Sequence, residues 1–181
     1  MAPRRTRSHL VFILGGASSG KSEVAFRLAS KGIGKKAPRA FVATGEGLDE
    51  EMAIKIARHR QSRSSDWITA EVPLELTAWL KEQGQDFRTI LIDCLTMWLS
   101  NRWREGSKEE EILQDARTFL TALRRLKART IMVSNELGMG LVPIEADSRR
   151  FREVAGALNR LVAQEADEAY FVVSGISLRL K

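Results

Sequence analysis

The segment Gly15–Ser22 reads Gly-Gly-Ala-Ser-Ser-Gly-Lys-Ser and matches the pattern G-x-x-x-x-G-K-[S/T]. It follows the continuous apolar run Leu10–Leu14, which is typical of a strand buried on both faces, and it opens a helical pattern over Ser22–Lys31. In such a turn the backbone N–H groups and the helix N-terminus converge on phosphate oxygens. We therefore predict a nucleoside triphosphate site whose phosphates are held by Gly15, Gly16, Ala17, Ser18, Ser19, Gly20, Lys21 and Ser22.

Three side chains are candidates for the chemistry of this site. Lys21 is expected to contact the β- and γ-phosphates, and the Ser22 hydroxyl is expected to bind Mg²⁺. Asp93 follows the apolar residues Ile90–Ile92, so it lies at the carboxyl end of a predicted strand, where α/β sheets form their ligand crevice. A buried strand that ends in aspartate is common, and a helix cap is the alternative role. We favour Asp93 as a ligand of Mg²⁺ or of its water shell.

Apolar runs of strand length alternate with helical patterns along the chain. Strands are predicted at 10–14, 40–44, 68–72, 89–93 and 130–134. Helices are predicted at 22–31, 49–63, 94–103 and 109–127, with one that starts at Pro73 and another from Ser148 onward. The ending, 170–173 and 177–180, is typical of a hairpin. This order predicts an α/β fold of the P-loop, RecA-like class, with a doubly wound, mostly parallel sheet and an antiparallel C-terminal hairpin. We predict one domain over 1–181, with 1–8 as a flexible basic tail.

Composition narrows the class of protein further. Cys94 is the only cysteine among the 181 residues, which excludes an intrachain disulfide and favours the reducing cytoplasm. No apolar stretch approaches the ~20 residues of a membrane span. The net charge of +6 comes from dispersed basic residues, and the densest internal cluster, Arg124–Arg129, lies at a predicted helix end without aromatic neighbours. We therefore expect a cytoplasmic protein that binds no nucleic acid and does not span a membrane.

The chain has two histidines, His9 and His59. His59 lies three positions after Ile56 on the apolar stripe of its predicted helix, and this pattern alone indicates a packed or capping histidine. Arg58 and Arg60 surround His59 with positive charge that would suit a nearby polyphosphate. His9 precedes the first strand and is expected to be structural or exposed.

Motifs beyond the phosphate loop resemble one family across nearly the whole chain, the bifunctional adenosylcobinamide kinase and adenosylcobinamide-phosphate guanylyltransferase of cobalamin biosynthesis. The most specific are Ser134–Pro143, which reads SNELGMGLVP, and Val172–Ile176, which reads VVSGI. The others are the phosphate loop, Ala43-Thr44, Asp49–Met52, His59-Arg60, Trp67 with Thr69 and Glu71, Asp93–Thr96 and Asn101. A general P-loop ATPase has no need of these residues.

The resemblance implies an enzyme with two activities. It would phosphorylate the aminopropanol hydroxyl of adenosylcobinamide with ATP or GTP, and would then transfer GMP from GTP to adenosylcobinamide phosphate. The guanylyl-histidine intermediate of the family assigns catalysis to His59, together with Lys21. Besides the phosphate loop, the implied nucleotide contacts are Ala43, Thr44, Gly45, Arg60, Gln61, Ser62, Glu71 and Asp93. The family also implies a homo-oligomer, a trimer.

One residue departs from the family pattern. Some members have two adjacent histidines here, and Arg58 occupies the first of these positions. Arginine cannot act as the nucleophile at neutral pH. Three interpretations stay open: His59 carries the guanylyl group, the group is transferred by another route, or the protein is only a kinase. We favour His59.

The segment Asn135–Asp147 is rich in glycine, lacks a clear period and is followed by Arg149, Arg150 and Arg152. Loops of this length are often functional, so we expect it to help bind the corrinoid or to close the site. The alternative is a sheet-edge connection before a basic helix face.

Two other functions are open for the chain as a whole. One is a small-molecule P-loop kinase without guanylyl transfer, which Arg58 supports. The other is a RecA-like ATPase stimulated by nucleic acid, which rests only on the positive net charge. Of the two, the kinase has the stronger support.

Overall fold

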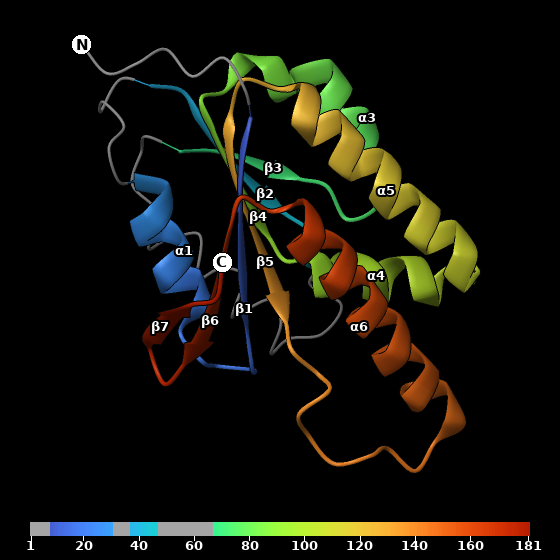
Figure 1. Cartoon of the computed structure of the whole chain (residues 1–181). Coiled ribbons are helices and arrows are strands. Elements are labelled where there is room, and N and C mark those ends of the chain that lie inside the picture. Colours follow the sequence, from blue (N-terminus) through green and yellow to red (C-terminus); the bar gives the residue numbers. More distant parts are fainter. Residues whose placement is uncertain (1–7, 31–36, 47–66) are drawn as a thin grey trace.

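The computed structural model describes residues 8–30, 37–46 and 67–181. Across these residues, helices cover both faces of one seven-stranded sheet (Figure 1). The strands are β1 (His9–Gly15), β2 (Arg39–Ala43), β3 (Trp67–Glu71), β4 (Thr89–Asp93), β5 (Arg129–Asn135), β6 (Glu168–Val173) and β7 (Ile176–Arg179). The helices are α1 (Lys21–Ser30), α3 (Leu76–Gln83), α4 (Leu95–Arg104), α5 (Glu109–Arg125) and α6 (Ala146–Glu165), with a short 3₁₀ helix at Gly84–Asp86.

The strand order in the sheet is β3-β2-β4-β5-β1-β6-β7, and every neighbouring pair is parallel except the last. β6 and β7 form an antiparallel hairpin joined by Ser174-Gly175. Because the parallel strands run the same way, their carboxyl ends gather at one edge of the sheet, the lower edge in Figure 1. This arrangement confirms the predicted fold class. Within the described ranges, no helix is long and apolar enough to cross a bilayer.

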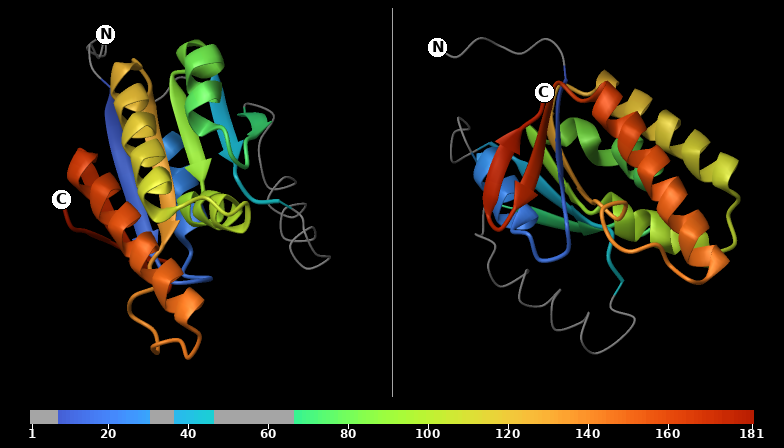
Figure 2. Two further views of the ribbon diagram at one scale, coloured as in Figure 1. Left: turned by 90° about the vertical axis from the view of Figure 1, so that its right-hand side faces the viewer. Right: turned by 60° about the horizontal axis from the view of Figure 1, so that its bottom comes forward.

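β1 shows how the core forms on both faces of the sheet. Leu10 and Phe12 belong to the core cluster under α3, α4, α5 and α6, whereas Val11 and Ile13 belong to the cluster under α1. Figure 2 shows these helices on opposite sides of the strands. All four side chains are at most 2% exposed. A strand buried on both faces offers no position for a polar residue, which explains the continuous apolar run in the sequence.

Two helices begin more than one residue away from the predicted position. α6 begins two residues before Ser148, because the Arg149 N–H donates to the Glu145 carbonyl at 3.2 Å and closes the first turn there. α3 begins three residues after Pro73. The carbonyl of Pro73 accepts a hydrogen bond from the Asn101 side chain at 3.1 Å and so takes no part in the helix.

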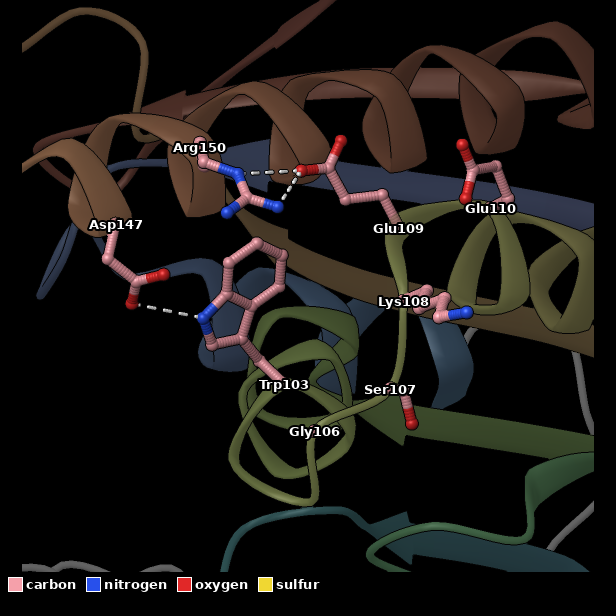
Figure 3. Close-up of a pocket in the computed structure, with 8 residues that line it drawn as sticks. All are labelled: Trp103, Gly106, Ser107, Lys108, Glu109, Glu110, Asp147 and Arg150. Atoms are coloured by element: carbon pink, nitrogen blue, oxygen red, sulfur yellow. Dashed lines mark hydrogen bonds and ion pairs between the residues drawn. The ribbon is translucent and has the colours of Figure 1, made fainter.

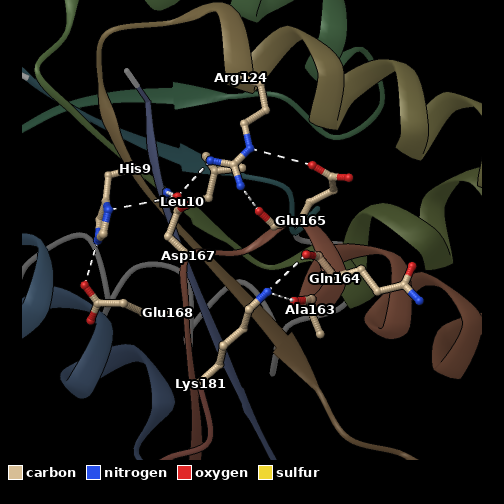
Figure 4. Close-up of polar contacts among 9 residues, drawn as sticks. All are labelled: His9, Leu10, Arg124, Ala163, Gln164, Glu165, Asp167, Glu168 and Lys181. Carbon is tan, nitrogen blue, oxygen red and sulfur yellow. Dashed lines mark hydrogen bonds and ion pairs between the residues drawn. The ribbon is translucent and has the colours of Figure 1, made fainter. Parts of the chain in front are cut away.

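A polar cluster ties the amino ends of β1 and β6 to α5 (Figure 4). The Asp167 carboxylate accepts hydrogen bonds from the Leu10 N–H and from the Arg124 guanidinium, each at 2.8 Å. His9 Nε2 lies 2.6 Å from Glu168 Oε1. Partial burial opposes the ionisation of Asp167, but the two donors outweigh it and hold the pKa of this carboxyl below its usual value. The cluster therefore stabilises the fold at the edge opposite the phosphate loop.

We expect the free energy of unfolding to decrease as the pH falls from about 5 to about 3. A hydrogen bond from the Tyr170 hydroxyl lowers the pKa of Glu168, and the pKa of Asp167 is lowered as well. Folded-state pKa values below the unfolded ones mean that both carboxylates stabilise the fold above the unfolded pKa. This contribution is lost as protons bind. Urea unfolding followed by circular dichroism at a series of pH values measures it.

Asp167→Asn should remove part of this pH dependence. It should also lower the free energy of unfolding at neutral pH by about 1 kcal/mol, since the acceptor of the Arg124 bond loses its negative charge on a partly exposed group. Glu165→Gln is the matched control, because the Glu165 side chain is 53% exposed and lies 3.6 Å from the same guanidinium. Equal losses in the two variants would contradict the role given to Asp167.

Candidate active site

The loop between β1 and α1 has positive φ angles and a close backbone contact, both of which favour small residues. Gly20 has a φ of 89° and Ser18 a φ of 54°. Gly15 has no room for a side chain, since a Cβ atom there would lie 2.4 Å from the Val172 carbonyl oxygen. The Val24 N–H donates to the Gly20 carbonyl at 3.1 Å, so the first turn of α1 closes directly on the loop. Strand, loop and helix N-terminus thus have the arrangement that binds phosphate.

Lys21 begins α1 and has a buried side chain. Its Nζ donates to the Gly16 carbonyl at 2.5 Å, across the loop. Burial lowers the pKa of Lys21, and the negative charges of Asp93 and Glu23 oppose this shift. The amine is therefore held within the loop, and its contact with phosphate stays a prediction.

Ser22 and Asp93 meet although they lie 71 positions apart in the chain. The Ser22 Oγ donates to Asp93 Oδ2 at 2.7 Å. Both residues offer oxygen atoms, which Mg²⁺ prefers, and Mg²⁺ sites need only one or two carboxylates when phosphates supply the other oxygens. In the part of the chain that the structure describes, no group of three or more His, Cys, Asp or Glu side chains is suited to hold a metal. The pair fits the predicted cation site.

Other predicted nucleotide contacts converge at the carboxyl ends of β2, β3 and β4. In the sheet, Ala43 pairs with Asp93 on one side and with Glu71 on the other. Thr44 is fully buried, and its hydroxyl donates to the Cys94 carbonyl at 2.6 Å and accepts from the Cys94 N–H at 2.8 Å. Thr44 therefore holds the backbone just after Asp93, a role that the sequence did not indicate.

Asn101 and Cys94 complete the support of this strand end. Asn101 is fully buried, and its Nδ2 donates to the Thr44 carbonyl at 2.8 Å. Burial raises the pKa of the Cys94 thiol to about 12, so this side chain is neutral at physiological pH. Asn101 thereby links α4 to the end of β2. Cys94 belongs to the core cluster under α1 and covers the carboxyl end of β4 on that side.

Four predicted site residues lie outside the described residues, as does the helix predicted at 49–63 that contains them. They are His59, Arg60, Gln61 and Ser62. Their roles stay predictions from the sequence. The other histidine, His9, lies in the polar cluster at the amino edge with Glu168, which agrees with the structural role expected for it.

A polar network at the carboxyl end of β5 was missed by sequence reasoning. Thr96 Oγ1 lies 3.0 Å from Ser134 Oγ and accepts a hydrogen bond from the Asn135 N–H at 2.8 Å. Asn159 of α6 donates to the Asn135 carbonyl at 3.0 Å. The available signal was the group of hydroxyl and amide residues at the ends of two neighbouring strands. The network fixes the point where the chain leaves β5 beside the phosphate loop.

The hairpin turn Ser174-Gly175 contacts the phosphate loop from the edge of the sheet. The Gly175 N–H donates to the Ser19 carbonyl at 2.8 Å. A Cβ atom on Gly20 would lie 3.1 Å from Gly175 Cα, so the two backbones are in close contact. Gly175 itself has a φ of 77°, a conformation that favours glycine. The turn therefore holds one carbonyl of the phosphate loop in position.

A cavity of about 550 Å³ lies apart from these residues, between the α4–α5 connection and the first turn of α6 (Figure 3). Trp103 Nε1 donates to Asp147 at 3.2 Å. Arg150 lies over the Trp103 ring, 5.8 Å from its centroid, and its Nη2 is 3.0 Å from Glu109 Oε1. None of the predicted nucleotide contacts lines this cavity.

The fold and the loop define the class: this is a P-loop nucleotide-binding protein with a RecA-like sheet. The flagellar accessory protein FlaH from Methanocaldococcus jannaschii shares the fold with a TM-score of 0.57 at 15% identity, over 96% of this chain and 78% of that chain. The KaiC-like protein PH0186 from Pyrococcus horikoshii OT3 has a TM-score of 0.54 at 15% identity, over 90% of this chain and 70% of that chain. At such identities the likeness concerns the fold alone.

Comparison of sequences then identifies the family. A family model described as cobinamide kinase / cobinamide phosphate guanyltransferase matches residues 11–180. The bifunctional adenosylcobalamin biosynthesis protein CobP of Pseudomonas aeruginosa is 39% identical over 170 residues, 93% of this chain and 95% of the relative. The CobU protein of Escherichia coli is 33% identical over 184 residues, 95% of this chain and 99% of the relative. This chain belongs to the cobinamide kinase / cobinamide phosphate guanyltransferase family, which confirms the resemblance seen in the sequence.

Gly175→Ala is expected to weaken the binding of ATP and GTP about three- to tenfold. A side chain at positive φ destabilises the turn by about 1 kcal/mol, and the Gly175 N–H then no longer holds the Ser19 carbonyl. Isothermal titration calorimetry measures the affinity.

Gly106→Ala is the matched control for this prediction. Gly106 also has positive φ, at 80°, and a Cβ atom on either glycine would meet no atom within 4 Å. Both substitutions therefore carry the same backbone penalty, but Gly106 lies in the α4–α5 connection. Unchanged nucleotide affinity in Gly175→Ala would show that the turn does not position the loop.

Proposed function

We propose that this protein phosphorylates the hydroxyl of adenosylcobinamide and then transfers GMP from GTP to the phosphate so formed. The family description and the names of the relatives support both the substrate and the pair of reactions. The observation that carries the proposal is the Ser22–Asp93 pair at the end of the phosphate loop, since phosphoryl transfer needs a cation site next to the phosphates. We also infer a single domain, a cytoplasmic location and a homotrimer, which rest on composition and on the family resemblance.

The kinase step uses a nucleoside triphosphate in the phosphate loop. The acceptor hydroxyl oxygen forms a bond to the γ-phosphorus, the bond from that phosphorus to the β–γ bridging oxygen breaks, and the nucleoside diphosphate leaves. The hydroxyl proton passes to solvent. Negative charge on the transferred group is stabilised by Lys21 and by the backbone N–H groups of the loop. Lys21 suits this task, because its side chain is held at the loop by the Gly16 carbonyl.

Ser22 and Asp93 are the residues that would hold Mg²⁺. The ion, when bound, neutralises charge on the β- and γ-phosphate oxygens. The Asp93 carboxylate orients the Ser22 hydroxyl through their 2.7 Å hydrogen bond. Thr44 holds the Cys94 backbone beside Asp93, and Asn101 holds the Thr44 carbonyl, so the carboxylate does not need to be repositioned for each turnover.

The guanylyl step is assigned to His59. A ring nitrogen of neutral His59 forms a bond to the α-phosphorus of GTP, and pyrophosphate leaves. A phosphate oxygen of adenosylcobinamide phosphate then forms a bond to the same phosphorus, and the phosphorus–nitrogen bond breaks, which restores the free histidine. The support for His59 is the family resemblance and its position between Arg58 and Arg60, whose charges suit a polyphosphate.

Incubation with GTP labelled at the α-phosphate tests this assignment. The expected result is a protein-bound label that is stable in base, labile in acid and absent from His59→Ala. Phosphoramidates of histidine have this stability, because protonation of the ring makes it a good leaving group. A chain that takes up no label but phosphorylates adenosylcobinamide would be a kinase without guanylyl transfer, the alternative that Arg58 supports.

Asp93→Asn is expected to lower the kcat of the kinase step about 100-fold and to raise the Mg²⁺ concentration needed for half-maximal rate. The amide oxygen still accepts the bond from Ser22, but the charge that attracts the cation is gone. Initial rates over a series of Mg²⁺ concentrations measure both effects. Glu23→Gln is the control, because it removes an exposed carboxylate from the first turn of α1, next to Ser22. Identical Mg²⁺ dependence in wild type and Asp93→Asn would rule out this role.

A further inference from the structure

Four apolar side chains project from the loop between β5 and α6. Met139, Leu141, Val142 and Ile144 are 78%, 97%, 67% and 90% exposed. Leu137, at the start of the same loop, packs against the core instead. Exposed apolar side chains gathered on one segment favour contact with an apolar ligand or partner. We call 139–144 the apolar loop.

The backbone of the apolar loop is held by two arginines of α6. Arg152 Nη1 donates to the Leu141 carbonyl at 3.1 Å. Arg149 Nη1 donates to the Pro143 carbonyl at 3.0 Å and also to the carbonyl of Ile144. The arginines that follow the loop in sequence thus support its backbone. The loop therefore presents its side chains in one arrangement, which reduces the entropy lost on binding.

The near end of the apolar loop starts beside the phosphate loop. Asn135 pairs with Gly15 in the sheet, and the Glu136 N–H donates to the Gly15 carbonyl at 3.0 Å. The Gly138 N–H donates in turn to the Glu136 side chain at 2.6 Å. Residues 139–144 therefore extend from the same edge of the sheet as the nucleotide phosphates, as the orange trace below β5 shows in Figure 1.

The far end of the apolar loop is anchored as well. Asp147, in the first turn of α6, accepts the hydrogen bond from Trp103 of α4 (Figure 3). Arg150 pairs with Glu109 at the start of α5. Both anchors lie outside the phosphate site. The loop is consequently fixed at two points while the side chains between them face solvent.

We propose that the apolar loop contacts the corrin ring of the acceptor while the hydroxyl arm of that molecule reaches the phosphate loop. This inference rests on the proposed function, because it takes the corrinoid as the acceptor. A corrin is a broad ring whose rim carries methyl groups as well as amide side chains. It is far wider than a phosphate site, so it must lie on the surface beside that site. The apolar loop offers hydrophobic contact there, and its backbone carbonyls at Leu141 and Pro143 are already bonded.

A second exposed apolar group, on the C-terminal hairpin, suits a different contact. Ile176 and Leu178 of β7 are 75% and 63% exposed. Among the described strands, β7 pairs with β6 alone. The outer edge of such a strand offers N–H and C=O groups, which favour pairing with another strand. The apolar loop differs from β7, because its carbonyls at Leu141 and Pro143 are already bonded and only its side chains are left for contact. Contact through side chains alone suits the apolar face of a small molecule better than a partner strand.

Leu141→Asp and Ile144→Asp test the proposal by equilibrium titration with adenosylcobinamide and, separately, with GTP. We expect each variant to bind adenosylcobinamide about tenfold more weakly, or worse, because a charge replaces an apolar side chain at the contact. GTP affinity and thermal unfolding should not change, since both side chains are exposed. Ile68→Asp is the matched control, because Ile68 is 59% exposed on β3, the outermost strand on the side of the sheet away from β7. This substitution should leave both affinities unchanged.

Three outcomes would overturn the inference. Equal adenosylcobinamide affinity in wild type and in both loop variants would remove the apolar loop from recognition and leave the proposed function standing. A wild-type protein that binds GTP but no corrinoid would overturn both. A change in subunit association in the loop variants, seen by analytical ultracentrifugation, would assign the apolar loop to contact between copies of the chain.

Discussion

The pairing of β1 with a parallel strand on each side is the constraint on which the rest of the structure depends. At its carboxyl end, Gly15 pairs with Asn135 of β5 and with Val172 of β6. Any larger residue at Gly15 would collide with the Val172 carbonyl, so the strands can meet here only around a glycine. The phosphate loop, the apolar loop and the C-terminal hairpin all leave the sheet from this point. One close backbone contact therefore sets the relative positions of three segments that are distant in sequence.

Side chains that bond to the backbone stabilise the strand ends around this point. Thr44 holds the end of β4, Asn101 holds the end of β2, and Thr96 and Asn159 hold the end of β5. These groups are buried or partly buried, and an unpaired backbone group in such surroundings would be costly. Rigid strand ends also allow a carboxylate such as Asp93 to keep its position relative to the phosphate loop. The same hydrogen bonds thus serve both folding and the candidate site.

Much of the fold could be predicted because its signals are local. The buried strand Thr89–Asp93 has the bounds predicted for it, since an apolar run between polar residues determines them. The phosphate loop is recognisable because its glycines and lysine are contiguous. The contact of Thr44 with Cys94 could not be predicted, because it depends on which residues of separate strands share a level in the sheet. The start of α6 before Ser148 was missed because no capping side chain marks it: Glu145 makes no side-chain cap bond, and its carbonyl closes the first turn.

The buried thiol of Cys94 makes the protein suitable for site-specific labelling. It is the only cysteine of the chain, it is enclosed next to Thr44, and its raised pKa leaves almost no thiolate at neutral pH. Thiol reagents attack the thiolate, so Cys94 is a poor target for them. A cysteine introduced on the apolar loop would then be the one reactive thiol of the chain. A fluorophore attached there would report the polarity around the loop directly, independently of turnover.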